Sequence, residues 1–317
     1  PIAKVWGRMR LPGQVIWASP FRETSRKAGG KGMPSPKTVQ YSYSVSLAIA
    51  LCEGEILGIG RIWADGDEIS PKSLNLRVYR GTEDQIPDPR IEVQYGQGMA
   101  PAYRGTAYVV LEDLELSSYG NRIPQFSFEV MRRAQGPEAE KVTDLQDVIK
   151  AVALIPGTGE YALSTKKVRQ EQSFGKLKSI NVNAPGGDTD LVTSVKQLRQ
   201  ELPNCKAVSL VVSWFGNDLR CGVCDVQPKV EQKEFLTNQL PWRAGGIGRS
   251  EAQEITRING RSIYGGTPAD TSVIEAIQLL RSMDQSIMFY PFVLMDQIAG
   301  NTLPDPYSET LSQPALP

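Results

Sequence analysis

The chain has 317 residues, and its 35 Lys and Arg side chains balance 35 Asp and Glu, so the formal net charge is zero. This length accommodates about two domains, and no segment approaches the roughly 18 consecutive apolar residues of a membrane-spanning helix. The chain contains no histidine, which excludes Ser-His-Asp triads, Cys-His dyads and histidine-ligated zinc within it.

Charge is unevenly distributed along the chain. The first 40 residues hold eight basic side chains against Glu23 alone, a balance of +7, which leaves −7 for the rest. The eight are Lys4, Arg8, Arg10, Arg22, Arg26, Lys27, Lys31 and Lys37. A basic segment on an acidic body is typical of an assembly subunit, so we predict that residues 1–38 form an extended basic arm and linker lying on a neighbour. A solvated, mobile terminus is the alternative. Because the chain opens on Pro1, we expect it to be processed or cut from a longer polypeptide.

The next segment predicts a β-rich domain over residues 39–133. Apolar and small or polar side chains alternate over thirteen residues in Val39–Leu51, which predicts a long, half-buried strand. Asp65-Gly66 is a hairpin turn signal. Shorter strands are expected at Arg61–Ala64, Asn75–Tyr79, Ile91–Gln94, Thr106–Leu111 and Gln125–Met131, with no helix between them; a short strand-like piece, Gln14–Trp17, is expected within the preceding arm.

The pattern changes in the second half of the chain. Residues 134–186 are predicted to be a connector with one helix, Asp144–Leu154, capped by Thr143. Two helix-then-strand pairs follow. A helix beginning at Asp188 or Thr189 precedes a buried strand at Ala207–Phe215, and a helix capped by Asp270 precedes a second buried strand at Ile287–Met295. This order indicates a parallel sheet, so residues 187–317 are interpreted as the N-terminal part of an α/β domain. The domain is incomplete for a barrel, which takes about 250 residues.

Three stretches resemble known tail proteins. Tyr43–Gly66 and Ala102–Val130 (AYRGTAYVVLEDLELSSYGNRIPQFSFEV) resemble the central tail-tip proteins of long-tailed bacteriophages, also called host-specificity or tip-attachment proteins. A third set is similar to the TIM-barrel-like domain, often labelled glycoside-hydrolase-like, of gene-transfer-agent tail proteins. It comprises Ser209–Cys224 (SLVVSWFGNDLRCGVC), Arg261–Ala269 (RSIYGGTPA) and Tyr290–Tyr307 (YPFVLMDQIAGNTLPDPY).

The resemblance implies a multidomain fold and a structural role. The fold is a mainly β, tail-hub-like domain followed by part of a TIM-barrel-like α/β domain. The role is that of a hub at the tail tip or baseplate of a phage or gene-transfer-agent virion, joining the end of the tail tube to host-contacting fibres and passing DNA. The implied partners are further copies of the chain in a threefold ring, the distal tail protein, other hub proteins and tail fibres. The host envelope is contacted indirectly, DNA is only cargo, and assembly takes place in the host cytoplasm.

Contacts between copies are expected at the basic arm, the long strand and the turns of the β domain. The candidate interface residues are Lys4, Arg8, Arg10, Tyr41, Tyr43, Leu47, Arg104, Asn121 and Arg122.

Two carboxylates follow the two buried strands and raise an alternative function. Catalytic groups gather at the carboxyl ends of barrel strands, and glycosidases use two carboxylates. Asp218 and Asp296 are therefore catalytic candidates for a hydrolase of cell-wall or capsule glycan acting during host entry, with Trp214, Tyr290 and Tyr307 as candidates for stacking on sugar rings. Asp is also a common turn residue after a strand, and aromatic residues beside buried strands are more often core. We therefore expect a non-enzymatic protein.

Metal and cofactor binding are not expected. Cys221 and Cys224 form a CxxC with Cys205 nearby, and these three are the candidate ligands. Zinc takes four ligands, and neither a histidine nor a second CxxC completes the set. Free thiols or one local disulfide are expected instead. The Gly-rich segments match neither a Walker loop nor a dinucleotide fingerprint.

Overall fold

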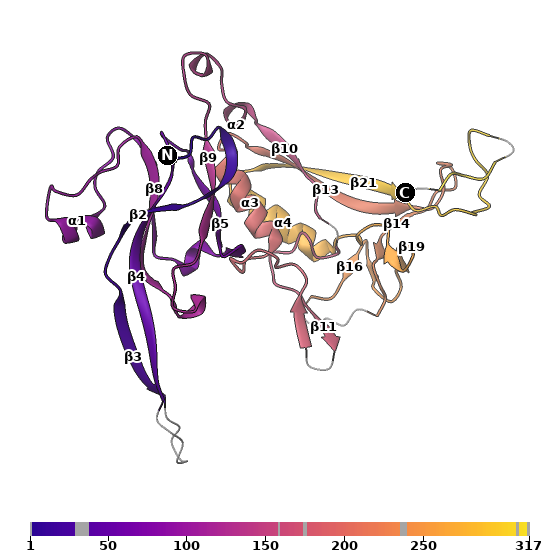
Figure 1. The fold of residues 1–317 in the computed structure, drawn as a ribbon. Helices are drawn as coiled ribbons and strands as arrows, with labels where there is room; N and C mark the ends of the chain where they lie inside the picture. Colours follow the sequence, from indigo (N-terminus) through magenta and orange to yellow (C-terminus); the bar gives the residue numbers. More distant parts are fainter. Residues whose placement is uncertain are drawn as a thin grey trace. The chain divides into compact units, whose positions relative to one another are not determined.

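The computed structural model describes residues 2–28, 38–157, 159–173, 176–234, 240–308 and 311–315. The chain divides into two compact units, unit 1 (Pro1–Val142) and unit 2 (Thr143–Pro317), and each is described by itself (Figure 1). The Gly- and Pro-rich part of the predicted linker, residues 29–37, lies outside the described residues. No helix in the described part of the chain is long and apolar enough to cross a membrane.

Unit 1 consists of two antiparallel sheets packed on a shared core. One sheet has the order β1-β9-β5-β6 and the other β2-β4-β8-β7, with β3 also paired to β4. The strands are β1 (Gly7–Pro12), β2 (Gln14–Ala18), β3 (Arg22–Ala28), β4 (Thr38–Glu53), β5 (Gly58–Ala64), β6 (Asp67–Ile69), β7 (Leu76–Tyr79), β8 (Thr106–Glu115) and β9 (Phe126–Arg132). The helices are η1 (Pro71–Ser73), α1 (Pro89–Tyr95), η2 (Ser117–Tyr119) and η3 (Ala139–Lys141).

Strand β4 is buried on both faces over most of its length. Its odd residues from Val45 to Leu51 pack between the two sheets against side chains of β5, β8 and β9, Phe128 among them. Ala48, on the opposite face, packs in a second cluster with Trp17 and Tyr108. The predicted half-buried strand is therefore confirmed in its position and alternation, but it is solvated only in its first residues. The small side chains at even positions are what allow a second layer to cover that face.

Residues 7–28 do not form an arm separate from the β domain. β1 pairs with β9 through Gly7–Pro12, and β2 and β3 pair with β4. Only one side chain of β1, Leu11, is buried, so the strand has no apolar alternation to reveal it in the sequence. It forms because the edge of the sheet provides a hydrogen-bonding partner for its backbone.

One of the predicted strands is a helix. Ile91–Gln94 lies within α1, where the Asp88 carboxylate caps the helix by accepting hydrogen bonds from the backbone N–H groups of Arg90 (2.8 Å) and Ile91 (3.3 Å). Pro89 occupies the first turn, where its missing N–H costs no helical hydrogen bond. Ile91 is the single buried residue of this helix.

Unit 2 is built on a three-stranded parallel sheet in the order β10-β13-β21, to which β14 adds an antiparallel pairing at the end of β13. Helices α3 and α4 pack together on one face of this sheet, over Val208, Leu210 and Val212. The helices are α2 (Leu145–Val148), α3 (Asp190–Glu201) and α4 (Asp270–Ser282), and the strands of the sheet are β10 (Ala151–Leu154), β13 (Ala207–Gly216), β14 (Val226–Gln227) and β21 (Ser286–Met295). Short pairs make up the remainder: β11 (Arg169–Ser173) with β12 (Lys176–Ser179), β15 (Lys229–Val230) with β18 (Gln253–Glu254), β16 (Arg243–Ala244) with β17 (Ile247–Gly248), and β19 (Arg257–Ile258) with β20 (Arg261–Ser262).

The second half of the predicted helix Asp144–Leu154 is a strand. Helix α2 ends at Val148, and Ala151–Leu154 pairs in parallel with Ala207–Leu210. Tertiary pairing outweighs the helical propensity of this short Ala- and Leu-containing segment. Most of the predicted connector is thus part of unit 2, and Tyr161 and Val168 contribute to its core.

Strand β21 is paired as predicted but is not buried. It lies at the edge of the sheet, paired in parallel with β13 from Ser286 to Met295. Met288, Tyr290 and Phe292 project from the face opposite the helices and are all exposed. Three parallel strands with helices on one face are compatible with the start of a barrel, although the described residues form an open sheet.

Leu47 should be essential to folding, because its side chain is completely buried between the two sheets. Leu47→Ala is expected to lower the free energy of unfolding by about 2–5 kcal/mol, and Leu47→Asp to abolish folding of unit 1. The matched control Tyr41→Ala, at an exposed position of the same strand, should change it by less than about 0.5 kcal/mol. Urea unfolding followed by circular dichroism measures all three. A folded Leu47→Asp protein would contradict the burial of this residue.

Candidate functional site

The most exposed apolar surface of unit 1 lies on the segment of residues 82–104, here called the α1 loop. It contains helix α1 and projects from the outer face of the sheet (Figure 1). Ile86, Val93, Tyr95 and Met99 are exposed, Val93 to 77% and Met99 to 75%. Grouped exposed apolar side chains of this kind mark contact surfaces, so the α1 loop is a candidate interaction site.

Buried side chains hold the α1 loop rigidly on the sheet. Ile91 and Ala100 pack against Trp17, Tyr108 and Val110, on the face of the sheet turned away from the main core. Tyr108 also stacks on Tyr79, with ring centroids 4.4 Å apart. The exposed apolar residues are therefore presented from a fixed base.

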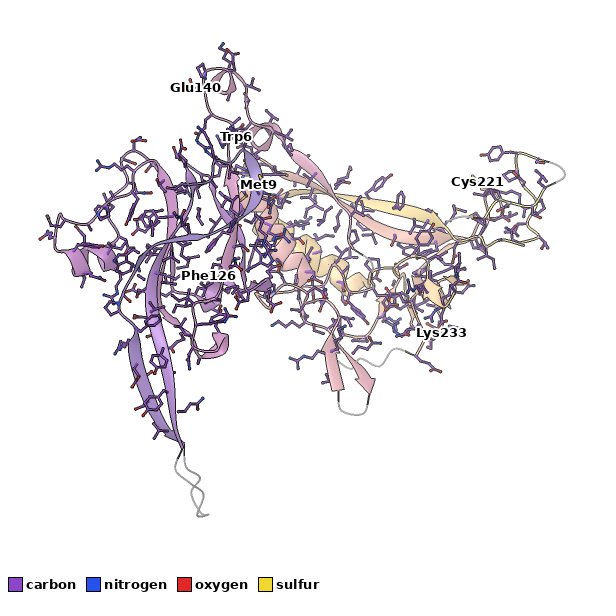
Figure 2. All side chains as sticks on the ribbon, viewed as in Figure 1. Trp6, Met9, Phe126, Glu140, Cys221 and Lys233 are labelled. Atoms are coloured by element: carbon purple, nitrogen blue, oxygen red, sulfur yellow. The ribbon has the colours of Figure 1, made fainter. Side chains whose placement is uncertain are left out.

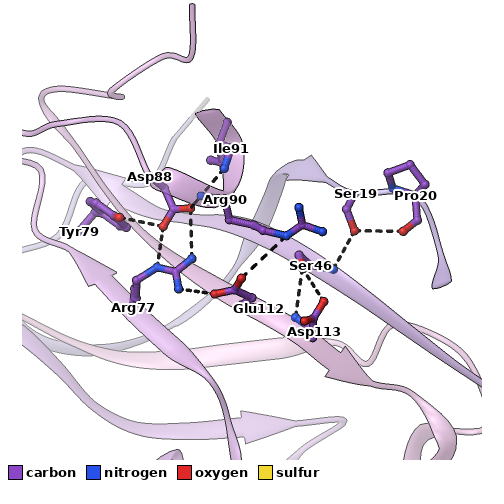
Figure 3. Close-up of polar contacts among 10 residues, drawn as sticks. All are labelled: Ser19, Pro20, Ser46, Arg77, Tyr79, Asp88, Arg90, Ile91, Glu112 and Asp113. Carbon is purple, nitrogen blue, oxygen red and sulfur yellow. Dashed lines mark hydrogen bonds and ion pairs between the residues drawn. The ribbon is translucent and has the colours of Figure 1, made fainter. Parts of the chain in front are cut away.

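A buried carboxylate, that of Asp88, joins the loop to strand β7 (Figure 3). Asp88 is fully buried and accepts hydrogen bonds from Arg77 Nε (2.8 Å), Arg77 Nη2 (3.2 Å) and the Tyr79 hydroxyl (2.7 Å), besides the two capping N–H groups. Arg77 also donates to Glu112 Oε2 at 2.5 Å, and Arg90 lies 3.9 Å from Glu112 Oε1. One guanidinium thus connects the start of α1 to strand β8.

These contacts fix the charge states in the network. Burial raises the pKa of Asp88, but hydrogen bonds from Arg77, Tyr79 and the backbone outweigh it, and the net pKa is below the usual value. Burial and the hydrogen bond to Asp88 raise the pKa of the Tyr79 hydroxyl. Asp88 is therefore ionised and Tyr79 neutral at pH 7, as their donor and acceptor roles require.

A second exposed feature is the two-stranded extension formed by β3 and residues 38–43 of β4, here called the β3–β4 ribbon (Figure 1). Strand β8 pairs with β4 only as far as Ser44, so the ribbon has no third strand within the described chain. Val39 and Tyr41 are exposed on the face that leads into the core at Val45. Tyr43, between them and the core, donates a hydrogen bond to Glu23 at 2.9 Å.

A hydrogen-bonded serine marks the point where the ribbon joins the sandwich. Ser46 is fully buried; its N–H donates to Ser19 Oγ (3.0 Å), and its carbonyl accepts from the Ser19 N–H (2.9 Å). Its hydroxyl accepts from the Asp113 N–H (3.1 Å), at a point where the pairing of β4 with β8 is irregular and Asp113 has a φ of 50° (Figure 3). The serine thereby satisfies backbone groups that the irregular pairing leaves free.

Most of the predicted interface residues have partners within the chain. The Lys4 ammonium lies 3.6 Å from the Glu53 carboxylate, and the Arg8 guanidinium lies 2.9 Å from that of Glu129. Arg10 stacks 4.1 Å over the Trp63 ring and donates a hydrogen bond to Ser127. Arg104 donates to the Gln85 carbonyl, and Arg122 donates two hydrogen bonds to Asp65. Asn121 occupies a left-handed turn with φ 57°. Hydrogen bonds from Arg8, then from Arg61, lower the pKa of Glu129 to about 2. These side chains stabilise the fold of unit 1.

Leu47 is predicted from the sequence to be an interface residue, but its side chain is buried in the core of unit 1. It is therefore not available for a contact between copies. Of the predicted interface residues on β4, Tyr41 is half exposed and Tyr43 is partly buried beneath it, so only Tyr41 offers a surface.

In unit 2, the two candidate catalytic carboxylates follow neighbouring parallel strands, as predicted. Each is engaged by its own cation. Asp218 accepts two hydrogen bonds from Arg220 (3.0 and 2.6 Å) and one from Gln313 (2.7 Å), and Asp296 pairs with buried Lys229 at 2.8 Å. The Arg220 contact lowers the pKa of Asp218 far below its usual range. A general acid must carry a proton at working pH, and Asp218 is unsuited to that role.

The three candidate stacking residues do not share a site. Trp214 lies on the face of β13 that carries the helices and packs closely on Gly245, whereas Tyr290 projects from the opposite face of β21. Tyr307 is almost completely exposed and lies beyond the sheet.

The four cysteines are free thiols. Cys52 and Cys205 are buried, Cys224 is half-buried, and Cys221 is exposed on the loop after β13 (Figure 2). Among the described residues, no group of three or more potential ligands is placed to hold a metal ion.

A cavity of about 430 Å³ lies at the carboxyl end of β10 and the start of α3. Glu160, Asp190 and Glu231 line it together with Asn181 and Tyr161. Glu160 is buried and bonded to both terminal nitrogens of Arg249. Burial raises the pKa of Glu160, and the contact with Arg249 opposes the rise. The carboxylates nearest the cavity are thus tied into the packing of unit 2.

Sequence reasoning missed the α1 loop and the Glu160–Arg249 pair. The Asp88-Pro89 dipeptide is a helix-start signal that could have indicated α1 in place of the predicted strand at Ile91–Gln94. No such signal identifies Glu160 and Arg249, which are 89 residues apart.

Comparison with known proteins points to a virion. One chain of a solved structure described as the virion of a native gene transfer agent particle is 58% identical to this chain, over 49% of this chain and 31% of that one, with a TM-score of 0.38. This likeness in sequence supports a structural component of a virion. The chain spans less than a third of that protein, and the TM-score is too low for the arrangement of its parts to be carried over. No protein-family model and no curated protein matches the chain.

Asp88 should stabilise unit 1 in a pH-dependent manner. Because its folded pKa is below that of the unfolded chain, about 3.9, its contribution is present above that pH and is lost as the pH falls. Asp88→Asn should lower the free energy of unfolding at pH 7 by about 2–3 kcal/mol, less than for a fully buried pair because Arg77 is one-third exposed. The difference from the wild type should shrink below pH 4.

Thermal unfolding between pH 2 and pH 7 measures this effect. Exposed Asp84→Asn, which removes a carboxylate from the same loop, is the matched control. Equal stability of the wild-type and Asp88→Asn proteins at pH 7 would contradict the role of the network.

Proposed function

We propose that this chain is a structural component of the tail-tip or baseplate hub of a phage or gene-transfer-agent virion. The 58% identity to a gene-transfer-agent virion chain carries the proposal. The resemblance of Tyr43–Gly66 and Ala102–Val130 to tail-tip proteins places the chain, in this proposal, at the distal end of the tail. There it joins the tail tube to host-contacting fibres and passes DNA.

The surface of unit 1 is suited to assembly. Lys4, Arg8 and Arg10 near its N-terminus have partners within the chain, while the α1 loop and the β3–β4 ribbon leave apolar side chains in solvent. A ring of copies, a homotrimer in this proposal, would cover such surfaces; further contacts would be made with the distal tail protein and with fibres. In unit 2, the open sheet of β10, β13 and β21 is proposed to be part of a TIM-barrel-like domain.

The proposed role involves no turnover. Asp218 and Asp296 are each paired with a cationic side chain, and the three aromatic candidates do not share a site.

The second candidate function, hydrolysis of cell-wall or capsule glycan during entry, is favoured by the cavity near Glu160 and Glu231 at the carboxyl end of β10. That edge is where ligands bind in α/β sheets.

Cryo-electron microscopy of intact particles tests the structural role. We expect ring-shaped density for this chain at the distal end of the tail. A chain absent from purified particles and found soluble and monomeric would overturn the proposal.

Glycan release tests the alternative. The full-length protein is expected to release no fragments from peptidoglycan or exopolysaccharide. Release that disappears in an Asp218→Asn/Asp296→Asn or a Glu231→Gln protein, but persists in an Asp225→Asn control, would establish the hydrolase instead.

A further inference from the structure

Two surfaces of unit 1 complement one another but lie on different parts of it. The α1 loop presents Val93, Tyr95 and Met99, and the β3–β4 ribbon presents Val39 and Tyr41. The loop connects β7 to β8 and packs over Trp17, Ala48 and Tyr108, whereas the ribbon extends from β4 beyond Ser44, where the pairing with β8 ends. Both sets are exposed in the single chain, so neither covers the other.

The charges of the two surfaces are opposite. Glu83, Asp84 and Glu92 of the α1 loop form no ion pair with any described residue, whereas the basic side chains of the loop, Arg90 and Arg104, are directed at groups of unit 1. Strand β3 of the ribbon carries Arg22, Arg26 and Lys27 in its sequence against Glu23 alone, which accepts a hydrogen bond from Tyr43, and exposed Arg22 has no ion-pair partner among the described residues. Complementary charge of this kind orients partners and suppresses wrong pairings.

The ribbon also lacks a layer that its strands require. A two-stranded ribbon is only marginally stable in water unless further strands or a helix cover its apolar face. The apolar stripe of β4 continues from the core, through Val45 and Tyr43, to Tyr41 and Val39, where the covering sheet has ended. Helix α1, on which Val93 and Tyr95 are exposed, has the form of the missing layer.

We propose that the α1 loop of one copy packs on the β3–β4 ribbon of the next copy. Val93, Tyr95 and Met99 cover Val39 and Tyr41. The acidic residues Glu83, Asp84 and Glu92 face strand β3 of the ribbon, whose net charge is positive. Because two different surfaces meet, the contact is head-to-tail, and head-to-tail contacts generate rings when the rotation closes. The inference rests on the proposed function and names the surfaces that would form its ring.

Mixing two defective proteins tests the head-to-tail geometry. Tyr41→Asp disables the ribbon and Val93→Asp disables the α1 loop, while each leaves the other surface intact. Each variant alone should self-associate at least about tenfold more weakly than the wild type, an effect expected of a central apolar contact. An equimolar mixture should restore one contact and give a 1:1 dimer, measured by analytical ultracentrifugation. Leu145→Asp, at an exposed apolar position of unit 2, is the matched control and should associate like the wild type.

Cross-linking in assembled particles gives a second measurement that does not depend on association in solution. In a chain with exposed Cys221 replaced by Ser, Tyr41→Cys and Val93→Cys together should form disulfide-linked multimers on mild oxidation. Either cysteine alone should not.

The outcomes separate the two proposals. Two results would overturn the ribbon–loop contact and leave the proposed function standing. One is a mixture that does not dimerise although the wild-type protein self-associates. The other is the absence of cross-links in particles that contain the chain. Absence of the chain from particles would overturn the proposed function itself.

Discussion

The burial of β4 on both faces is the constraint on which the architecture of unit 1 depends. On one face its branched side chains form the core of the sandwich, and on the other Ala48 and Ser46 are small enough to admit a second layer. That second layer is the α1 loop, seated through Ile91 and Ala100. A larger residue at position 48 would therefore displace the loop without touching the main core. The loop is thus packed on the sheet through its own small core of buried residues.

The polar contacts of unit 1 serve the same arrangement. Asp88 is both the helix cap of α1 and the anchor of Arg77 on β7, so one carboxylate determines where the helix begins and how it sits on the sheet. Removing a charged partner from such a buried group costs more than the pair contributes, because the remaining charge is left unsatisfied. This makes the position of the exposed residues Val93 and Met99 a consequence of interactions several residues away. A surface held in this way loses little conformational entropy when it is covered.

The sequence predicted the elements whose own side chains carry a period, and it failed where pairing partners decided the structure. Residues 39–51 and the two long helices of unit 2 carry apolar side chains at the spacing of a strand or a helix, and the two long strands of unit 2 are near-continuous apolar runs. Strand β1 has a single buried side chain, Leu11, and therefore no such signal, and Ala151–Leu154 forms a strand because it pairs with β13. The interface residues were chosen largely for their charge. Charge alone does not distinguish Arg122, which is bonded to Asp65, from a side chain available to another molecule.

The pairing of charged side chains within a chain, and the exposure of its apolar side chains, indicate which kind of contact its surface can make. In both units the charged side chains singled out in the sequence are largely consumed by internal pairs: Arg8 with Glu129, Asp218 with Arg220, and Lys229 with Asp296. An active site requires the reverse, polar groups left available to a substrate in a closed setting. Among the described residues, the α1 loop, the ribbon and the outer face of β21 leave apolar side chains exposed. Exposed apolar surface is costly for a solitary protein and useful to one that is covered by neighbours, and for that reason these surfaces agree with the proposed role in an assembly.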